Sequence, residues 1–371
     1  MRKMTKKDDN AQESYELVSG QHGGYWRHAF TDHNYLYNLY YPPADFFSHI
    51  TKHIKQLVLS YPGGQSEMAG LVGKLIDQPA ANIVVGNGAA ELIKIIAGLG
   101  RKMIVPVPSF NEYANAMPAG DVVEFALAAP SFQLDVAKFA EAAINSKAEL
   151  AVVVSPNNPT SLLVPKTQLV WLANKLAEHG CMLIVDESFI DFAKNRAQET
   201  LEPEIEKYPN LAIFKSMSKA YGICGIRIGY MLSANLEFAA EVRQGLHIWN
   251  LNGFAEEFLR LAPQYQQEFK DSCNKVQADR DLFYEQLQTI PGMIVYKPDA
   301  NYIFCRLPEH APSGPIITEK LFVEHNIYIK HCQGKTMPES DRYLRIASRT
   351  QDENTRLVAT LHNLVGLAET K

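Results

Sequence analysis

Cysteine is scarce in this sequence, and its positions show no pairing. Of 371 residues, five are cysteine, and no two of them have the short spacing of a metal-binding pair. The five are Cys181, Cys224, Cys273, Cys305 and Cys332. An odd, scattered set argues against a disulfide-stapled scaffold and a zinc module, and it is typical of reduced thiols. We therefore expect a cytoplasmic protein with no bound metal.

Long apolar runs and an excess of positive charge are also lacking. No apolar run approaches the length that crosses a bilayer, and the first stretch, MRKMTKKDDNAQE, has no apolar core of a signal peptide. The formal net charge of −5 gives no basic surface for nucleic acid or an anionic membrane. We expect neither partner. Residues 1–14 are predicted to be mobile or to be a linker from an upstream sequence.

Short apolar runs alternate with helical patterns, which predicts an α/β fold. Predicted strands cover residues 81–85, 103–107, 122–127, 150–154, 181–185 and 211–214, and predicted helices cover 44–60, 67–75, 136–146 and 167–179. Apolar strands separated by helices favour a mostly parallel sheet covered on both faces. A chain of 371 residues has room for this large domain and a smaller one.

The smaller domain is predicted to be α+β. A long helix over residues 254–287 leads into strands at 293–295, 302–306, 327–330 and 343–346, and a helix over 352–367 closes it. The predicted boundaries are 1–45 for an N-terminal arm, 46–260 for the large domain and 261–371 for the small C-terminal domain.

Polar clusters follow the predicted strands of the large domain. They are residues 86–90, 108–113, 155–160, 186–189 and 216–227. Because ligands bind beyond the carboxyl ends of such strands, clusters that all fall at strand ends predict one site at that edge.

The stretch LAIFKSMSKAYGICGIRIGY, from Leu211 to Tyr230, contains the main candidate residue, Lys219. A desolvated lysine can form a Schiff base with an aldehyde. Ser216, Ser218 and Arg227 could hold an anion beside it, and an aldehyde that carries a phosphate is pyridoxal phosphate. The alternative is a solvent-exposed loop lysine among turn glycines.

Other strand ends offer the remaining groups that this cofactor needs. Asp186 could pair with the pyridine nitrogen, Asn158 could donate to the ring oxygen, and Phe110 could stack on the ring. The turn Gly88-Ala89-Ala90 opens a helix and could cradle the phosphate. Taken singly, each also fits a plain role: a helix cap for Asp186, a turn for Asn158, a core aromatic for Phe110 and a tight turn for the glycine segment.

Six motifs in order resemble the class I/II aminotransferase family of fold-type I pyridoxal-phosphate enzymes. They are VGNGAAELI, PSFNEY, SPNNPTS, VDESFIDF, SMSKAYGICGIRIGY and YLRIASRT. Within the family, the resemblance extends to histidinol-phosphate aminotransferases and, more closely, to threonine-phosphate decarboxylases. It implies the fold-type I transferase fold with a seven-stranded sheet, pyridoxal 5'-phosphate as cofactor, and Lys219 as Schiff-base lysine and proton shuttle.

The resemblance also implies roles for residues outside the cofactor contacts. Tyr61 would reach the phosphate of the partner subunit's cofactor, which implies a homodimer. Arg345 would bind the α-carboxylate of a small amino acid, and Arg349 follows it. Three further residues would handle a distal phosphate: His22, Asn38 and Lys330. The sequence departs from the family pattern at three positions: Ser161 replaces the usual glycine, Leu36 the usual asparagine and Lys330 the usual arginine. The identity of the group at the distal end of the substrate is therefore undetermined.

Three functions follow from these residues. Transamination of a small amino acid with a phosphate or phosphonate group is the first choice, and decarboxylation of such an amino acid is the close alternative. A non-enzymatic cofactor-binding regulator is the third, and the sequence has no basic DNA-binding module to support it.

Overall fold

The computed structural model describes residues 6–21 and 23–366, which divide into two compact units. The larger unit runs from Tyr37 to Gln277. The smaller unit combines the residues up to Leu36 with those from Ala278 on, so the division falls inside helix α12 (Gln266–Leu287). The domain boundaries expected from the sequence stay a prediction.

A seven-stranded sheet forms the centre of the larger unit, in the order β2-β8-β7-β6-β5-β3-β4. The strands are β2 (Ile83–Gly86), β3 (Met103–Val107), β4 (Val122–Ala126), β5 (Leu150–Val154), β6 (Met182–Asp186), β7 (Leu211–Ser216) and β8 (Gly229–Leu232). Only β8 is antiparallel to its neighbours, and the other pairs are parallel. The prediction of a mostly parallel α/β sheet is confirmed, although β8 was not predicted as a separate strand.

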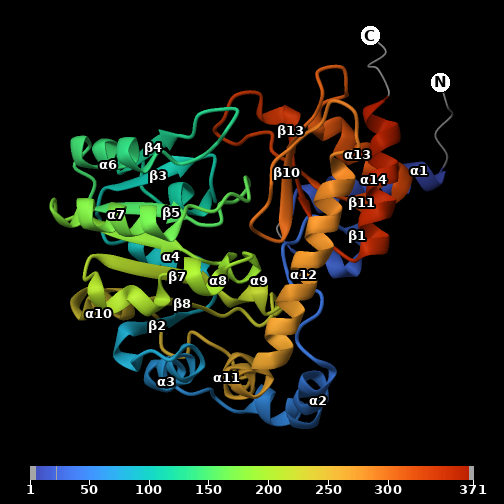
Figure 1. The fold of residues 1–371 in the computed structure, drawn as a ribbon. Helices are drawn as coiled ribbons and strands as arrows, with labels where there is room; N and C mark the ends of the chain where they lie inside the picture. The colour runs from blue at the N-terminus through green and yellow to red at the C-terminus, as the bar shows by residue number, and fades with distance from the viewer. Residues whose placement is uncertain (1–5, 22, 367–371) are drawn as a thin grey trace. The chain divides into compact units, whose positions relative to one another are not determined.

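Helices cover this sheet because its strands are apolar on both faces. β5 and β6 are buried along their whole length, which fits their β-branched composition. The helices of the unit are α2 (Ala44–Leu59), α3 (Gln65–Ile76), α4 (Ala89–Ala97), α5 (Glu112–Asn115), α6 (Val136–Asn145), α7 (Lys166–Ala177), α8 (Arg196–Glu199), α9 (Met217–Ala220), α10 (Leu236–Gln244) and α11 (Gly253–Leu261). Helices α6 and α7 pack side by side, and α7 also packs on β6 (Figure 1).

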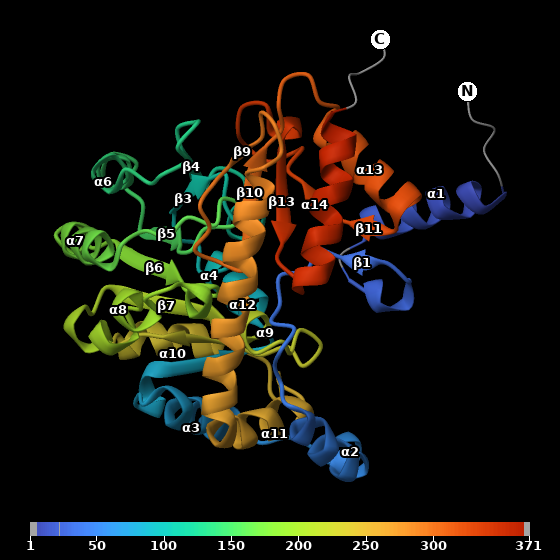
Figure 2. The same cartoon turned by 45° about the vertical axis from the view of Figure 1, so that its right-hand side comes forward.

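The smaller unit contains an antiparallel four-stranded sheet in the order β12-β13-β10-β9. A separate parallel pair joins β1 to β11. The strands are β1 (Thr31–Asp32), β9 (Ile294–Val295), β10 (Tyr302–Arg306), β11 (Ile327–Tyr328), β12 (Lys330–His331) and β13 (Tyr343–Ala347), and the other helices are α1 (Lys6–Ser19), α13 (Gly314–His325) and α14 (Gln351–Val365). Figure 2 shows α13 and α14 next to one another.

Three expectations for these elements were wrong in detail. The strand expected over 327–330 is two strands, because β11 pairs with β1 whereas β12 pairs with β13. The helix expected over 254–287 breaks after α11, because Pro263 lacks an N–H and disturbs the preceding turn. Residues 6–14, predicted to be mobile or a linker, form part of helix α1, whose Tyr15 ring lies tilted 5.6 Å from the Phe322 ring of α13; residues 1–5 lie outside the described residues.

The described helices include none long and apolar enough to span a bilayer. Within the described ranges, no group of three or more His, Cys, Asp or Glu side chains is placed to hold a metal ion.

Candidate active site

Loops that follow neighbouring parallel strands meet at the carboxyl edge of the large sheet. The Ser155 N–H, after β5, donates to the Asp186 carbonyl at 2.9 Å, and the Ser216 N–H, at the end of β7, donates to Ser188 Oγ at 2.9 Å. Glu187 N–H donates to the Phe214 carbonyl at 2.8 Å. Three of the predicted clusters, those at residues 155–160, 186–189 and 216–227, are thus in contact.

Asp186 is the buried acid of this edge, with 3% of its surface exposed. The Ser188 N–H donates to Oδ1 at 2.9 Å, and the Tyr113 hydroxyl donates to Oδ2 at 2.9 Å. Burial raises the pKa of Asp186, whereas the bonds from Ser188 and Tyr113 and the charge of Lys219 lower it. On balance the pKa of Asp186 is raised. The residue is a buried carboxyl group that is held by Ser188 and Tyr113 and lies near the candidate lysine.

Gly88 and Arg227 form a cradle at the start of α4. Gly88 has φ +73°, and a Cβ placed there would collide with the Arg227 guanidinium. Gly229 allows an equally close approach, because its Cβ would collide with the Ala89 N–H. Arg227 Nη1 donates to Ser218 Oγ at 3.0 Å and to the Cys224 carbonyl at 3.1 Å. A guanidinium, a hydroxyl and the first N–H groups of a helix are the donors that suit a phosphate.

Lys219 lies on α9, directly after β7. Its carbonyl accepts the Asn38 N–H at 2.9 Å, which ties the segment after Leu36 to the lysine loop. The Asn38 amide donates to the Ala220 carbonyl at 2.9 Å and to Ser272 Oγ at 2.8 Å. Both amide hydrogens are therefore used within the larger unit, and the expected contact of Asn38 with a distal phosphate stays a prediction.

The two asparagines after β5 differ in their surroundings. Asn157 Oδ1 accepts from Ser109 at 2.7 Å, and its amide donates to the Pro108 carbonyl and to Thr160 Oγ1, both at 3.0 Å. Asn157 thereby joins the loops after β3 and β5. Asn158 is also buried, and its role toward a cofactor oxygen stays a prediction.

Two aromatic residues that the sequence assigned to the cofactor lie in the larger unit. Phe110 is half-buried and meets the Tyr113 ring edge-on, with ring centroids 6.3 Å apart. Tyr61 is 78% exposed and stacks on Trp249 at 4.3 Å. Both predicted contacts, with the ring and with a partner's cofactor, stay predictions.

Cationic side chains gather at the β12–β13 pair of the smaller unit. Lys330 and Arg345 are register partners, and Arg345 Nη2 donates to the carbonyl and to Oδ1 of Asn34, at 2.8 and 2.9 Å. Lys335, in the loop between the two strands, was not singled out from the sequence. Burial lowers its pKa to about 8, and the charges of Arg345 and Lys330 act in the same direction. We call Lys330, Lys335 and Arg345 the cationic cluster.

The other two residues assigned to the substrate are not in this cluster. Arg349 forms an ion pair with Glu353 at 3.0 Å and donates to the Asp32 carbonyl at 2.9 Å. His22 lies outside the described residues. For both, a role toward the substrate stays a prediction.

A second set of charges, including Lys215, lies beside Ser216 on β7. Lys215 is buried and forms ion pairs with Asp191 at 3.1 Å and Glu202 at 3.5 Å, and Arg196 also pairs with both carboxylates. These residues line a cavity of about 1070 Å³. Because each of these charges has an opposite charge beside it, the set is a structural ion-pair network.

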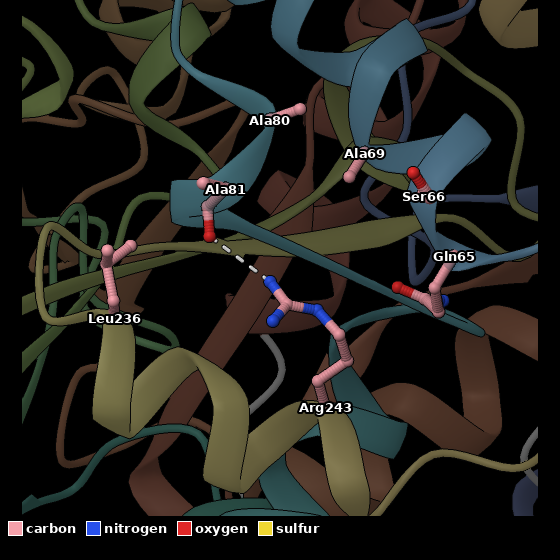
Figure 3. A pocket seen from close by; sticks show the side chains of 7 residues that line it. All are labelled: Gln65, Ser66, Ala69, Ala80, Ala81, Leu236 and Arg243. Carbon is pink, nitrogen blue, oxygen red and sulfur yellow. Dashed lines mark hydrogen bonds between the residues drawn. The ribbon is translucent and has the colours of Figure 1, made fainter.

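A smaller cavity of about 550 Å³ lies between α3 and α10 (Figure 3). Its walls are mainly alanine and leucine. The one ionisable side chain that lines it, Arg243, donates to the carbonyls of Ala81 at 3.2 Å and Ile83 at 3.1 Å. Its one hydroxyl belongs to Ser66, and the side chains that line the cavity include no acid or general base to activate it, so the cavity suggests no catalytic site.

Comparison with known proteins identifies relatives along nearly the whole chain. A model of the family described as aminotransferase class I and II matches residues 54–361. A CMP-5'-(3-aminopropyl)phosphonate synthase from Streptomyces rubellomurinus is 39% identical over 95% of this chain and 56% of its own length. An L-serine phosphate decarboxylase from Sulfurospirillum multivorans is 29% identical over 85% of this chain and 82% of its own.

Among solved structures, the histidinol-phosphate aminotransferase from Clostridium acetobutylicum has a TM-score of 0.82 and 27% identity, over 90% of this chain and 99% of its own. The resemblance to the family and its fold is thus confirmed, and so is the occurrence of both reaction types among the relatives. The chain spans little more than half of the length of two curated relatives, 56% and 57%.

Pyridoxal phosphate is the cofactor of this family, and the residues present fit it. The cradle of Gly88, Ser218 and Arg227 suits its phosphate, and the buried carboxylate of Asp186 suits its basic ring nitrogen. The cofactor prediction is confirmed at the level of the family, whereas the individual contacts stay predictions.

Replacement of Gly88 by alanine tests the cradle. The new Cβ would collide with Arg227 at a backbone angle that disfavours side chains, so the cofactor dissociation constant should rise at least about tenfold. Fluorescence titration of the cofactor-free protein measures this constant. Gly70→Ala is the matched control, because Gly70 has open space around its Cβ position. Equal affinities of the two variants would contradict the assignment.

Proposed function

We propose an activity for this chain, which belongs to the aminotransferase class I and II family: pyridoxal-phosphate-dependent chemistry at the α-carbon of a small amino acid that bears a phosphate or phosphonate group. The observation that carries the proposal is one edge of the large sheet. The Gly88–Arg227 cradle, the buried Asp186 and Lys219 all lie at strand ends of this edge, after β2, before β8, at the end of β6 and after β7. The bound cofactor would supply an electron sink that stabilises negative charge at the α-carbon.

The protein's own residues would hold and protonate the reacting groups. Arg227 and Ser218 would bind the cofactor phosphate, and Asp186 would orient the ring through its nitrogen. Lys219 would anchor the cofactor and move a proton at the α-carbon through its Nζ. Nothing in the described edge requires a metal ion for these tasks.

The cationic cluster supports an anionic substrate. Arg345 would bind the α-carboxylate as a planar fork, and Lys330 with Lys335 would bind a dianionic tail. Like charges that are buried together repel one another, so an anion between them would relieve that repulsion. The relatives named for a phosphonate product and for serine phosphate agree with such a tail.

Decarboxylation is the reaction that we favour. One relative is named a decarboxylase, and an aminopropyl phosphonate has an amine but no carboxylate. Phe189, buried after β6, also lacks the hydroxyl of the tyrosine that aminotransferases usually carry there. Transamination is the second candidate, supported by the likeness to histidinol-phosphate aminotransferase.

A single-turnover reaction with phosphoserine or an aminophosphonobutyrate separates the two reactions. Decarboxylation should release carbon dioxide and leave the cofactor absorbance as it began, whereas transamination should yield a keto acid and the amine form of the cofactor. Lys219→Ala should abolish both, because it removes the amine assigned to the Schiff base and to proton transfer. Turnover unchanged in Lys219→Ala would refute both reactions.

Lys335 should set a pH limit on substrate binding. Its folded pKa of about 8 means that it is charged below pH 8 and neutral above it. The KM for a phosphate-bearing substrate should therefore rise above pH 8, about tenfold for the loss of one charged contact. Lys335→Met should have the high KM at every pH. Plain amino acids should show no such difference, and a pH dependence that survives in Lys335→Met would contradict the role.

We also propose a homodimer, supported by one apolar surface. Phe47, Ile54 and Val58 recur on one face of α2 and are exposed, as are Tyr61 and Trp249. Exposed apolar surface of this extent is typical of an interface, and the exposed Tyr61 is the residue that the resemblance directs to the partner's cofactor. A cytoplasmic location is supported by five cysteines that form no disulfide, four of them buried.

Val58→Glu should disrupt this dimer, because a carboxylate would be buried at the interface. Light scattering should show a monomer, and activity should fall with it if Tyr61 completes the partner's site. Lys52→Glu, on an exposed position of the same helix, serves as the charge control. A Val58→Glu protein that stays dimeric would place the interface elsewhere.

A further inference from the structure

Tyr113 is the part of the PSFNEY segment to which the residue pattern gave no function. It lies on the short helix α5, after β3, and is fully buried with its hydroxyl on Oδ2 of Asp186 at 2.9 Å. Its ring also meets Phe110, the aromatic residue expected to stack on the cofactor. One side chain therefore contacts two groups assigned to the cofactor ring.

The two oxygens of Asp186 are held by donors from different elements. Ser188 N–H approaches Oδ1 from the loop after β6, and Tyr113 approaches Oδ2 from α5. The Ser188 side chain also bonds to this carboxyl group. Donors on both oxygens fix the plane of the carboxylate, and lone pairs remain for a ring N–H. The charge of Lys219 also favours the ionised form of Asp186.

We propose that Tyr113 is a positioning residue, which holds the Asp186 carboxylate charged and in plane so that it keeps the cofactor's ring nitrogen protonated. The proposal rests on the proposed function. A phenol that lies in a dry interior and donates to a carboxylate has little tendency to ionise, and burial together with Asp186 raises the pKa of Tyr113 well above 10. The hydroxyl therefore stays a donor throughout the working pH range.

Tyr113→Phe tests this role, because it removes the hydroxyl and keeps the ring. Without that donor the Asp186 carboxylate is less stable as an anion, so the ring nitrogen should lose its proton at lower pH. The ¹⁵N NMR signal of cofactor labelled at the ring nitrogen reports this titration directly. We expect its midpoint to fall by about one pH unit, and kcat to fall about tenfold with KM unchanged.

Tyr230→Phe is the matched control. Tyr230 is also fully buried in the larger unit, and its hydroxyl donates to the carboxylate of Glu202, in the ion-pair network. The control should lose comparable stability in urea unfolding but leave the ¹⁵N titration unchanged. Equal titrations in wild type and Tyr113→Phe, with comparable stability losses in both variants, would overturn the proposal.

A further substitution covers the case in which Tyr113→Phe does not fold. Site-specific 3-fluorotyrosine at position 113 keeps the size of the side chain and is a stronger donor, so the ¹⁵N midpoint should move upward. A midpoint that does not move would count against the role of Tyr113. Absence of a bound cofactor signal in the wild-type protein would instead refute the proposed function.

Discussion

A carboxylate at the end of a fully buried strand is the constraint around which the larger unit is arranged. Desolvation raises the pKa of Asp186, and Ser188, Tyr113 and Lys219, from three different segments, offset part of this increase. In the nearby ion-pair network, the charges are neutralised by one another. Lys215, Asp191, Arg196 and Glu202 satisfy one another, whereas Asp186 keeps acceptor capacity for a ligand.

In the anion cradle, the group held in place by neighbouring residues is a cation, the Arg227 guanidinium. Arg227 lies at φ +66°, a conformation that non-glycine residues rarely adopt, and its bonds to Ser218 and the Cys224 carbonyl hold it there. Gly88 and Gly229 remove the side chains that would block the guanidinium and the first N–H groups of α4. Strain and close approach are thus concentrated where a phosphate would bind.

The sequence predicted those parts of the structure that depend on local pattern. β3, β5 and β10 were predicted to the residue, since their apolar, β-branched or aromatic runs have few alternatives. The break at Pro263 was missed because the apolar pattern continues across it. β8 was missed because it is four residues long and follows the glycine-rich loop, and its place depends on pairing with β2 and β7.

In the candidate site, too, residues marked by a local pattern were predicted, and residues placed by the fold were missed. The strand-end clusters located Asp186, Lys219 and Arg227, because each follows an apolar strand. Tyr113 lies 73 positions before Asp186 in the sequence, and no local pattern reveals their hydrogen bond. Lys335 lies in a polar loop and resembles any exposed lysine until the fold places it beside Lys330 and Arg345.

The antiparallel strand β8 has a consequence for biosynthesis. β8 lies between β2 and β7 in the sheet. During translation, β2 is therefore synthesised well over a hundred residues before β8, the strand with which it pairs. Until then the apolar residues Ile83, Val84 and Val85 lack their partner strand, and Gly229 is not yet beside Ala89. A nascent chain that does not yet include β8 therefore exposes an unpaired apolar strand, which is prone to aggregation, and has no complete phosphate cradle.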